Sequence, residues 1–112
     1  MTLTTAKPFT LDEIAKLSQE YEVYIKTVID IENKICVAGM KMHYQGEKIL
    51  LDQGSRQKNI WGGGIDLETK EIDYNSLINI RPQDKNTRNE IQDSKIRELY
   101  LDLSKYFFKK IL

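Results

Sequence analysis

The sequence predicts an α+β domain: an antiparallel meander of about four or five strands, with an N-terminal and a C-terminal helix packed on one face. Three observations support this class. Apolar residues recur at helical spacing near both ends of the chain, over 11–20 and 93–111. They alternate with polar residues in the middle, over 23–44 and 72–81. Short polar sequences of turn type separate the alternating segments, which is typical of hairpins.

The first helix is expected from about Leu11 to Glu20. Thr10 and Glu13 have the spacing of a capping box, in which each side chain binds the backbone N–H of the other residue. Residues 1–8 precede this signal and are predicted to be a flexible tail. Residues 9–112 are predicted to form a single domain, because a chain of 112 residues has the usual size of one domain.

The segments 23–32 and 35–44 are predicted to form a hairpin. Asn33-Lys34 would be its two-residue turn, and that register places Ile31 opposite Cys36 and Ile29 opposite Ala38. A three-residue turn would move these pairs. Residues 41–52 allow two interpretations. We favour a turn at Gly46 followed by a short strand over 48–52, because a glycine inside a helix costs about 1 kcal/mol relative to alanine.

Two further strands are predicted at 59–67 and 72–81, joined by a polar connection. The second has five apolar-side and five polar-side positions in strict alternation and ends at Pro82, which has no N–H to donate. The glycines at 62–64 interrupt the first of these strands. Such glycines mark a bulge or the close approach of another backbone or a ligand. Asp93 is predicted to cap a final helix with a continuous apolar stripe that runs to Ile111.

Composition excludes several classes. The 17 basic and 17 acidic residues balance, so nucleic-acid binding is not expected, because such domains carry a basic excess. Cys36 is the one cysteine, which excludes a disulfide framework and a thiolate metal site. The N-terminus lacks the apolar core of a signal peptide and no segment is long enough to span a bilayer. We expect a cytoplasmic protein without a cofactor, with a protein partner or a second copy of itself as its binding partner.

Candidate catalytic residues centre on His43, the one histidine in the chain. It could act as a base with a nearby carboxylate, and the candidates are Asp30, Glu32 and Glu47. Asp30 and Glu32 are two residues apart on a predicted strand, so their carboxylates would be neighbours. The sequence has no H-E-x-x-H pattern, and we expect no metal site.

Candidate ligand-binding residues are Trp61, Asn79, Arg81 and Arg88. Arginine suits the recognition of a carboxylate or phosphate through two parallel hydrogen bonds. Asn79 and Arg81 would share one face of the strand predicted at 72–81. The alternative for Arg81 is an ion pair within the chain, and the alternative for Trp61 is a core position.

Several of these residues together resemble an uncharacterised family of small prokaryotic domains of unknown function. The resemblance covers most of the chain, and the run from Ser76 to Pro82 is its most specific part. The family implies a bacterial or archaeal cytoplasmic protein and brings no assigned activity. The residues that carry the resemblance are Asp30-Ile31-Glu32, His43, Glu47, Leu50-Leu51, Gly54-Ser55, Gln57, Trp61-Gly62 and Ser76-Leu77-Ile78-Asn79-Ile80-Arg81-Pro82.

Three functions remain open from the sequence. The first is a non-enzymatic binding or protein-interaction module, favoured because no recognised catalytic motif is present. The second is a small hydrolase that depends on a metal or on acid–base chemistry and uses His43 with nearby carboxylates. The third is an RNA-binding module that uses Arg81, Lys85, Arg88 and the C-terminal lysines.

Overall fold

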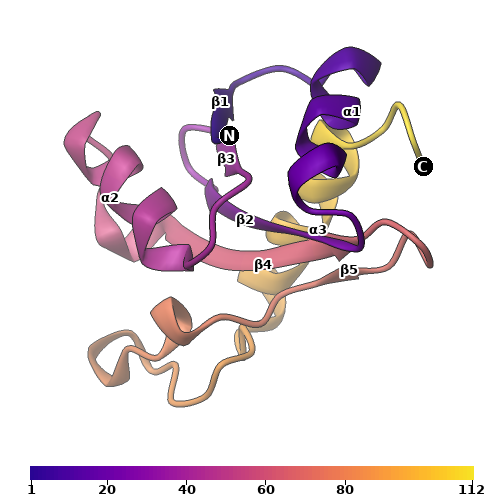
Figure 1. Ribbon diagram of the computed structural model, residues 1–112. Helices are drawn as coiled ribbons and strands as arrows, with labels where there is room; N and C mark the ends of the chain where they lie inside the picture. The colour runs from indigo at the N-terminus through magenta and orange to yellow at the C-terminus, as the bar shows by residue number, and fades with distance from the viewer.

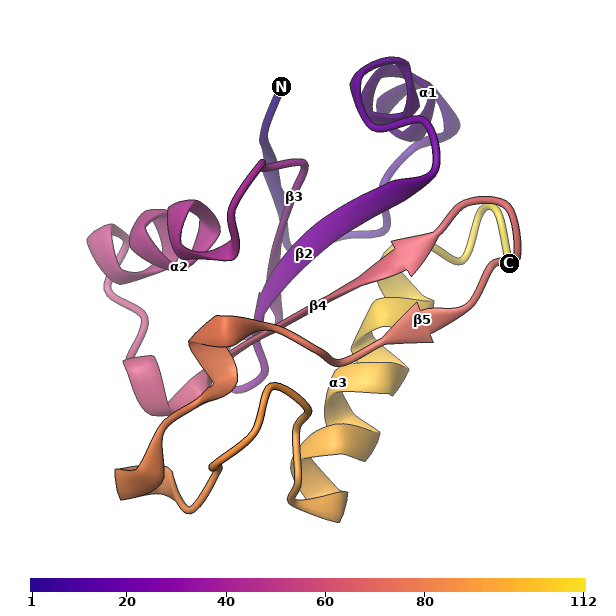
Figure 2. The ribbon, with the colours of Figure 1, turned by 60° about the horizontal axis from the view of Figure 1, so that its bottom comes forward.

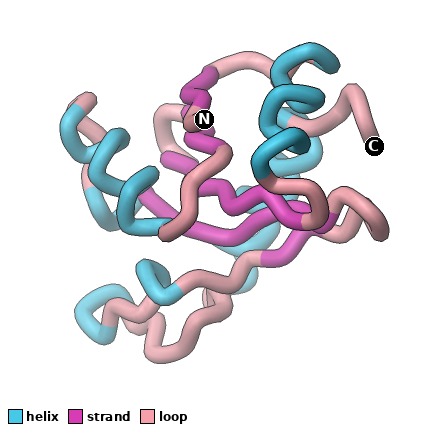
Figure 3. Tube along the Cα trace, in the orientation of Figure 1, coloured by secondary structure: helices cyan, strands magenta, loops and turns pink.

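The computed structural model describes residues 1–112 and contains five strands and three α-helices (Figure 3). The strands are β1 (Leu3–Thr5), β2 (Tyr24–Asp30), β3 (Ile35–Ala38), β4 (Ile60–Asp66) and β5 (Ile72–Asp73). The helices are α1 (Leu11–Glu20), α2 (His43–Asp52) and α3 (Ser94–Phe107). Three 3₁₀ turns complete the chain: η1 (Gln57–Asn59), η2 (Leu77–Asn79) and η3 (Pro82–Asp84).

All five strands belong to one open antiparallel sheet in the order β1-β3-β2-β4-β5. The predicted α+β class with an antiparallel sheet is therefore confirmed. The strand order is not sequential, because the connection from β3 to β4 passes through α2 and returns on the far side of β2 (Figure 1). The longest pairing joins β2 to β4 over all seven residues of each strand, and this pair forms the centre of the domain.

Both faces of the sheet are covered. The terminal helices α1 and α3 lie on one face, as predicted, and α2 lies on the other (Figure 1). The larger core contains Leu17 of α1 and Tyr100 of α3 against Ile29 of β2. The smaller core contains Leu50 of α2 against Val28 of β2. Residues Thr27–Asp30 of β2 are consequently all buried, since each face of this strand meets a helix layer.

The terminal helices begin where the sequence predicts. Thr10 accepts a hydrogen bond from the Glu13 N–H at 3.0 Å, and Glu13 accepts one from the Thr10 N–H at 2.9 Å. The Asp93 carboxylate accepts hydrogen bonds from the Lys95 and Ile96 N–H groups. Both caps satisfy backbone donors that have no partner inside the helix. No helix of the protein combines the length and the apolar character needed to cross a membrane.

The strand favoured over 48–52 is wrong, because residues 43–52 form α2. The reason is tertiary packing at Gly46, which is buried against the sheet. A Cβ at this position would lie 2.6 Å from Cε of Met40 and 2.9 Å from Cγ2 of Val28. Glycine therefore lets the helix axis approach β2 closely, and this contact outweighs the low helix propensity of the residue.

The first hairpin has a different register and a shorter second strand. Ile29 pairs with Cys36 and Thr27 with Ala38, so the pairing is shifted by two residues from the prediction. A shift of two keeps every side chain on its predicted face, because the side-chain period of a strand is two. The return strand ends at Ala38 rather than at residue 44, since the next residue, Gly39, has a φ of +85° that leaves the extended region. Residues 3–5 of the predicted tail form β1, which pairs with β3.

The strand predicted over 72–81 is wrong beyond Asp73. The Ser76 hydroxyl accepts a hydrogen bond from the Ile78 N–H at 3.2 Å and opens the turn η2. Local bonds from serine and asparagine side chains compete with a strand ladder, and here they replace it. Residues 74–92 instead form a folded loop along the sheet edge at the bottom of Figure 1.

Candidate functional site

A cavity of about 370 Å³ opens between the N-terminus of α2 and the loop at 75–78. It lies on the α2 face of the sheet, beyond the smaller core. Helix, strand and loop each contribute side chains, so the cavity depends on the complete fold. The lining residues are Lys26, Met42, His43, Tyr44, Asn75, Ser76, Leu77, Ile78 and Asn89.

His43 is held in one orientation in this cavity. Its Nε2 lies 2.7 Å from the carbonyl oxygen of Gly63 in β4. A carbonyl can only accept, so Nε2 carries the proton of the neutral ring and Nδ1 keeps its lone pair. Burial lowers the pKa of His43 below its usual value; the hydrogen bond to Gly63 opposes this effect, and the nearby Lys26 charge adds to it. The ring is therefore neutral at pH 7 and Nδ1 is a hydrogen-bond acceptor.

The glycines of β4 make room for this arrangement. A Cβ on Gly62 would lie 2.8 Å from the Ser76 hydroxyl oxygen and 3.1 Å from Cδ2 of His43. The absence of a side chain at Gly62 lets Ser76 and His43 approach the strand from the loop and from α2. The β2–β4 register is continuous through this point, so the glycine run marks close approach and not a bulge.

Exposed apolar side chains surround the cavity. Leu77 is 68% exposed, Tyr44 59% and Met42 48%, and all three line the opening. Lys26 is fixed nearby, since its ammonium group donates to the Lys41 carbonyl at 2.9 Å. The cavity therefore combines an apolar rim with residues that can form hydrogen bonds, which are His43, Ser76, Asn75 and Asn89.

A titration of His43 checks its environment. Because the pKa in the folded state lies below the usual 6.5, the unfolded chain binds more protons just below pH 6.5. The stability that this ring contributes is present above pH 6.5 and is lost as the pH falls through the lower, folded value. We expect NMR of the single imidazole to give a pKa below 6.5 and the Nε2–H tautomer. A pKa at or above 6.5 would show that the ring is solvated, and the Nδ1–H tautomer would show that it does not donate to Gly63.

Asp30 has a structural role away from the cavity. This buried carboxylate accepts hydrogen bonds from the Glu32 N–H, from the backbone and side chain of Asn33, and from the Ser55 hydroxyl at 2.6 Å. Burial alone would raise the pKa of Asp30, but the bonds from Asn33, Ser55 and Glu32 outweigh it and lower the pKa. Asp30 thus stays ionised while it holds the β2–β3 turn against the segment that follows α2.

The structure does not bring the candidate carboxylates together with His43. Glu32 is exposed on the β2–β3 turn. Glu47 lies one turn after His43 in α2, yet its buried Oε2 has no hydrogen-bond partner and its charge acts on Arg81. Neither these residues nor Asp30 line the cavity. No group of three His, Cys, Asp or Glu side chains lies close enough to hold a metal ion.

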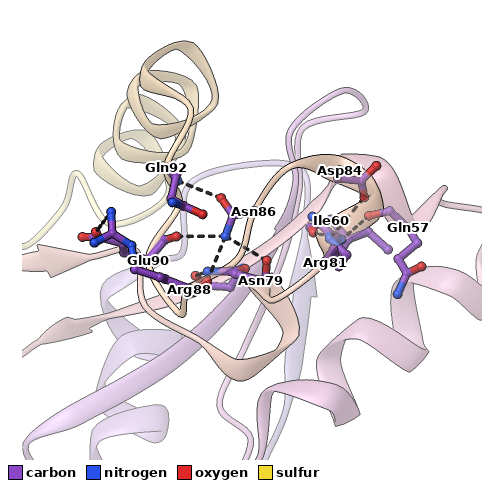
Figure 4. A network of polar contacts seen from close by, with 10 residues as sticks. Gln57, Ile60, Asn79, Arg81, Asp84, Asn86, Arg88, Glu90 and Gln92 are labelled. Carbon is purple, nitrogen blue, oxygen red and sulfur yellow. Dashed lines mark hydrogen bonds and ion pairs between the residues drawn. The ribbon is translucent and has the colours of Figure 1, made fainter.

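The side chain of Asn79 makes the hydrogen bonds to β4 that the backbone of a neighbouring strand would make. It is fully buried, and its side-chain amide both accepts from the Gly62 N–H and donates to the Gly62 carbonyl, each at 2.9 Å. The same NH₂ group also faces the carbonyls of Tyr74 and Asn89. The side chain of Asn86 also binds backbone groups, within the loop (Figure 4). It donates to the carbonyls of Asn79, Arg88 and Glu90 and accepts from the Gln92 N–H.

Arg81 is an internal residue and only 3% exposed. Its Nη1 donates to the carbonyls of Gln57 and Ile60 (Figure 4). Its guanidinium lies 4.0 Å from the centre of the Trp61 ring. Burial lowers the pKa of Arg81, whereas Asp84 and Glu47 oppose that effect. Trp61 is correspondingly a buried core residue. Arg88 lies on the surface and pairs with Glu90 at 3.0 Å.

Of the residues singled out in the sequence, His43 alone lines the cavity. The others at this site were missed because their signal is weak: Leu77 lay on the polar side of the predicted strand, and Met42 and Tyr44 flank a histidine in an ambiguous segment. The exposure of Leu77 follows from the turn η2, which the sequence pattern did not predict.

The fold and the cavity together define a small α+β domain with a two-sided antiparallel sheet and a surface pocket at the start of its middle helix. A family model described as a protein of unknown function (DUF5674) matches residues 3–105, and the chain belongs to this family. The predicted membership in an uncharacterised family of small domains is thereby confirmed. No curated protein and no solved structure matches the chain.

Proposed function

We propose that this domain is a non-enzymatic protein-interaction module that receives a peptide segment of a partner protein in the cavity beside His43. The observation that carries the proposal is the apolar rim. Leu77, Tyr44 and Met42 are among the most exposed large apolar residues of the protein, and they surround one opening. Exposed apolar surface gathered around a concave site marks an interaction surface more often than scattered apolar residues do.

The polar groups of the cavity suit a peptide backbone. His43 Nδ1 accepts a hydrogen bond, and the amides of Asn75 and Asn89 both donate and accept. A peptide that places an apolar side chain between Leu77 and Met42 would present its backbone N–H and C=O groups to His43, Asn75 and Asn89. The cavity volume of about 370 Å³ falls in the range of roughly 300–1,000 Å³ that is usual for binding pockets.

Hydrolysis is the less favoured function for a geometric reason. A base needs a nucleophile or a proton donor within hydrogen-bond reach. The one hydrogen bond of the His43 ring goes to the backbone carbonyl of Gly63, so no hydroxyl, thiol or carboxylate side chain is paired with it, and no carboxylate lines the cavity. RNA binding is less favoured because Arg81 is internal and Arg88 is paired with Glu90.

Selection from a random peptide display library tests the proposal. We expect peptides enriched on the wild-type protein to lose at least about tenfold in affinity for Leu77→Lys, because a charged side chain then occupies the apolar rim. Leu99→Lys is the matched control, since Leu99 is 48% exposed on α3 and does not line the cavity. Equal affinity for the two variants, or an absence of enriched peptides, would contradict the proposed function.

A further inference from the structure

A second hollow, of about 410 Å³, lies at the opposite end of the domain. It is formed by the turn before β5 and the C-terminal half of α3, which lie side by side near the chain end (Figure 2). Three of its six lining residues are lysines and three are aliphatic. The lining residues are Lys70, Ile72, Leu101, Lys105, Lys109 and Leu112.

The three lysines have no anionic partner in the protein. The ion pairs of the molecule involve Met1, Lys16, Lys48, Arg81 and Arg88 as cations, and none includes Lys70, Lys105 or Lys109. No aspartate or glutamate lines the hollow. The whole chain has a formal net charge of zero, so this cationic group is a local feature of one surface and not a consequence of overall basicity.

The lysines are presented by ordered elements. Lys70 adopts a left-handed backbone with a φ of +66°, and its N–H donates to the Asp66 carbonyl at 2.8 Å. The Asp66 carboxylate closes the same turn by accepting from the Glu68 and Thr69 N–H groups. Lys105 lies in the last turn of α3. The backbone positions of Lys70 and Lys105 are therefore set by the turn and by the helix. Lys109 follows in the turn after α3, with its ammonium group 5.7 Å from the centre of the Tyr106 ring.

We propose that this hollow binds an acidic peptide segment of a partner protein, with carboxylates on Lys70, Lys105 and Lys109 and an apolar side chain on the floor formed by Ile72 and Leu101. The charge of the lysines selects an acidic partner. The floor selects a peptide over a nucleic acid, because its apolar residues are aliphatic and offer no ring on which a base could stack. This site is independent of the cavity beside His43.

Fluorescence anisotropy with a labelled peptide of alternating glutamate and leucine tests the proposal. We expect binding that weakens as salt is raised, and a loss of about tenfold or more for the double variant Lys105→Glu/Lys109→Glu. The matched control is Lys58→Glu/Lys95→Glu, which makes the same change in net charge at exposed lysines outside the hollow. Thermal unfolding of both variants confirms that they are folded.

Four results would overturn the proposal. They are no binding at low salt, an equal loss in both double variants, equal binding of a peptide in which serine replaces leucine, and binding to vesicles that contain phosphatidylglycerol with none to the peptide. The third would show that the floor is not used. The fourth would assign the surface to an anionic membrane. Leu77→Lys should leave this binding unchanged, so failure here is distinguishable from failure at the His43 cavity.

Discussion

Asn79→Asp is expected to lower the free energy of unfolding by at least about 3 kcal/mol, although the two side chains have the same shape. The substitution removes the NH₂ group that serves the carbonyls of Gly62, Tyr74 and Asn89. It also places a carboxylate beside these carbonyl oxygens in a fully buried position. Urea unfolding at pH 7 measures the effect.

Asn75→Asp is the control for this experiment, because Asn75 is exposed and its side chain makes no hydrogen bond in the loop. A change within about 0.5 kcal/mol is expected there. The damage from Asn79→Asp should shrink in acid, because the folded-state pKa of the introduced carboxyl group would be raised by burial. A variant with a raised pKa is most stable below the unfolded-state value and loses stability as the pH rises. Equal effects of the two substitutions would show that Asn79 does not replace a strand.

Gly63→Ala is the second substitution with a large expected effect, about 3 kcal/mol or more of destabilisation. A Cβ on Gly63 would overlap the backbone carbonyl oxygen of Asp73, and it would lie 2.6 Å from the Tyr100 hydroxyl and 2.9 Å from Cα of Tyr74. Backbone atoms cannot rotate away as a flexible side chain can. β4 and β5 would therefore have to separate at the point where α3 meets the sheet. Thermal and urea unfolding measure the loss.

Gly54→Ala separates this steric effect from backbone strain. Gly54 has a φ of +101°, yet nothing lies within 4 Å of a Cβ built on it. Only the conformational cost of the left-handed region applies there, about 1–2 kcal/mol. A Gly63→Ala variant that is no less stable than Gly54→Ala would contradict the close packing of β4 against β5 at this residue.

The sequence predicts the elements that depend on local signals. The capping box at Thr10, the Asp93 cap, the apolar stripes of α1 and α3 and the alternation in β2 are properties of neighbouring residues, and these elements begin and end close to their predicted limits. The hairpin register also keeps the correct faces, although the turn is longer than predicted.

The remaining elements depend on contacts between distant residues. In the sequence, Gly46 indicates a turn. In the structure it lies in α2 and packs against β2, where the absence of a side chain lets the helix approach the strand closely. The alternation over 72–81 also predicts the wrong structure, because the side chains of Ser76 and Asn79 form hydrogen bonds with backbone groups that would otherwise bond within a strand ladder. The partner of Asn79 is Gly62, which lies 17 residues away in the chain, and a sequence pattern does not show which distant residues come together.

The candidate site was only partly predictable for the same reason. His43 stands out because it is the one histidine, and the structure places it in a cavity. Asp30, Asn79 and Arg81 have the residue types of a functional site, but each is buried and satisfies backbone groups of its own chain. Polar residues that build a loop and polar residues that bind a ligand have the same sequence signature until their partners are known.

The proposed peptide site is tested most directly by mapping a selected peptide on the ¹H–¹⁵N spectrum of the wild-type protein. We predict that amide shifts concentrate at Met42–Tyr44, Gly62–Gly63, Asn75–Ile78 and Asn89, and that the His43 Nδ1 resonance moves as it gains a hydrogen bond. Shifts confined to another surface, with the His43 imidazole unchanged, would contradict the assignment of this cavity as the interaction site.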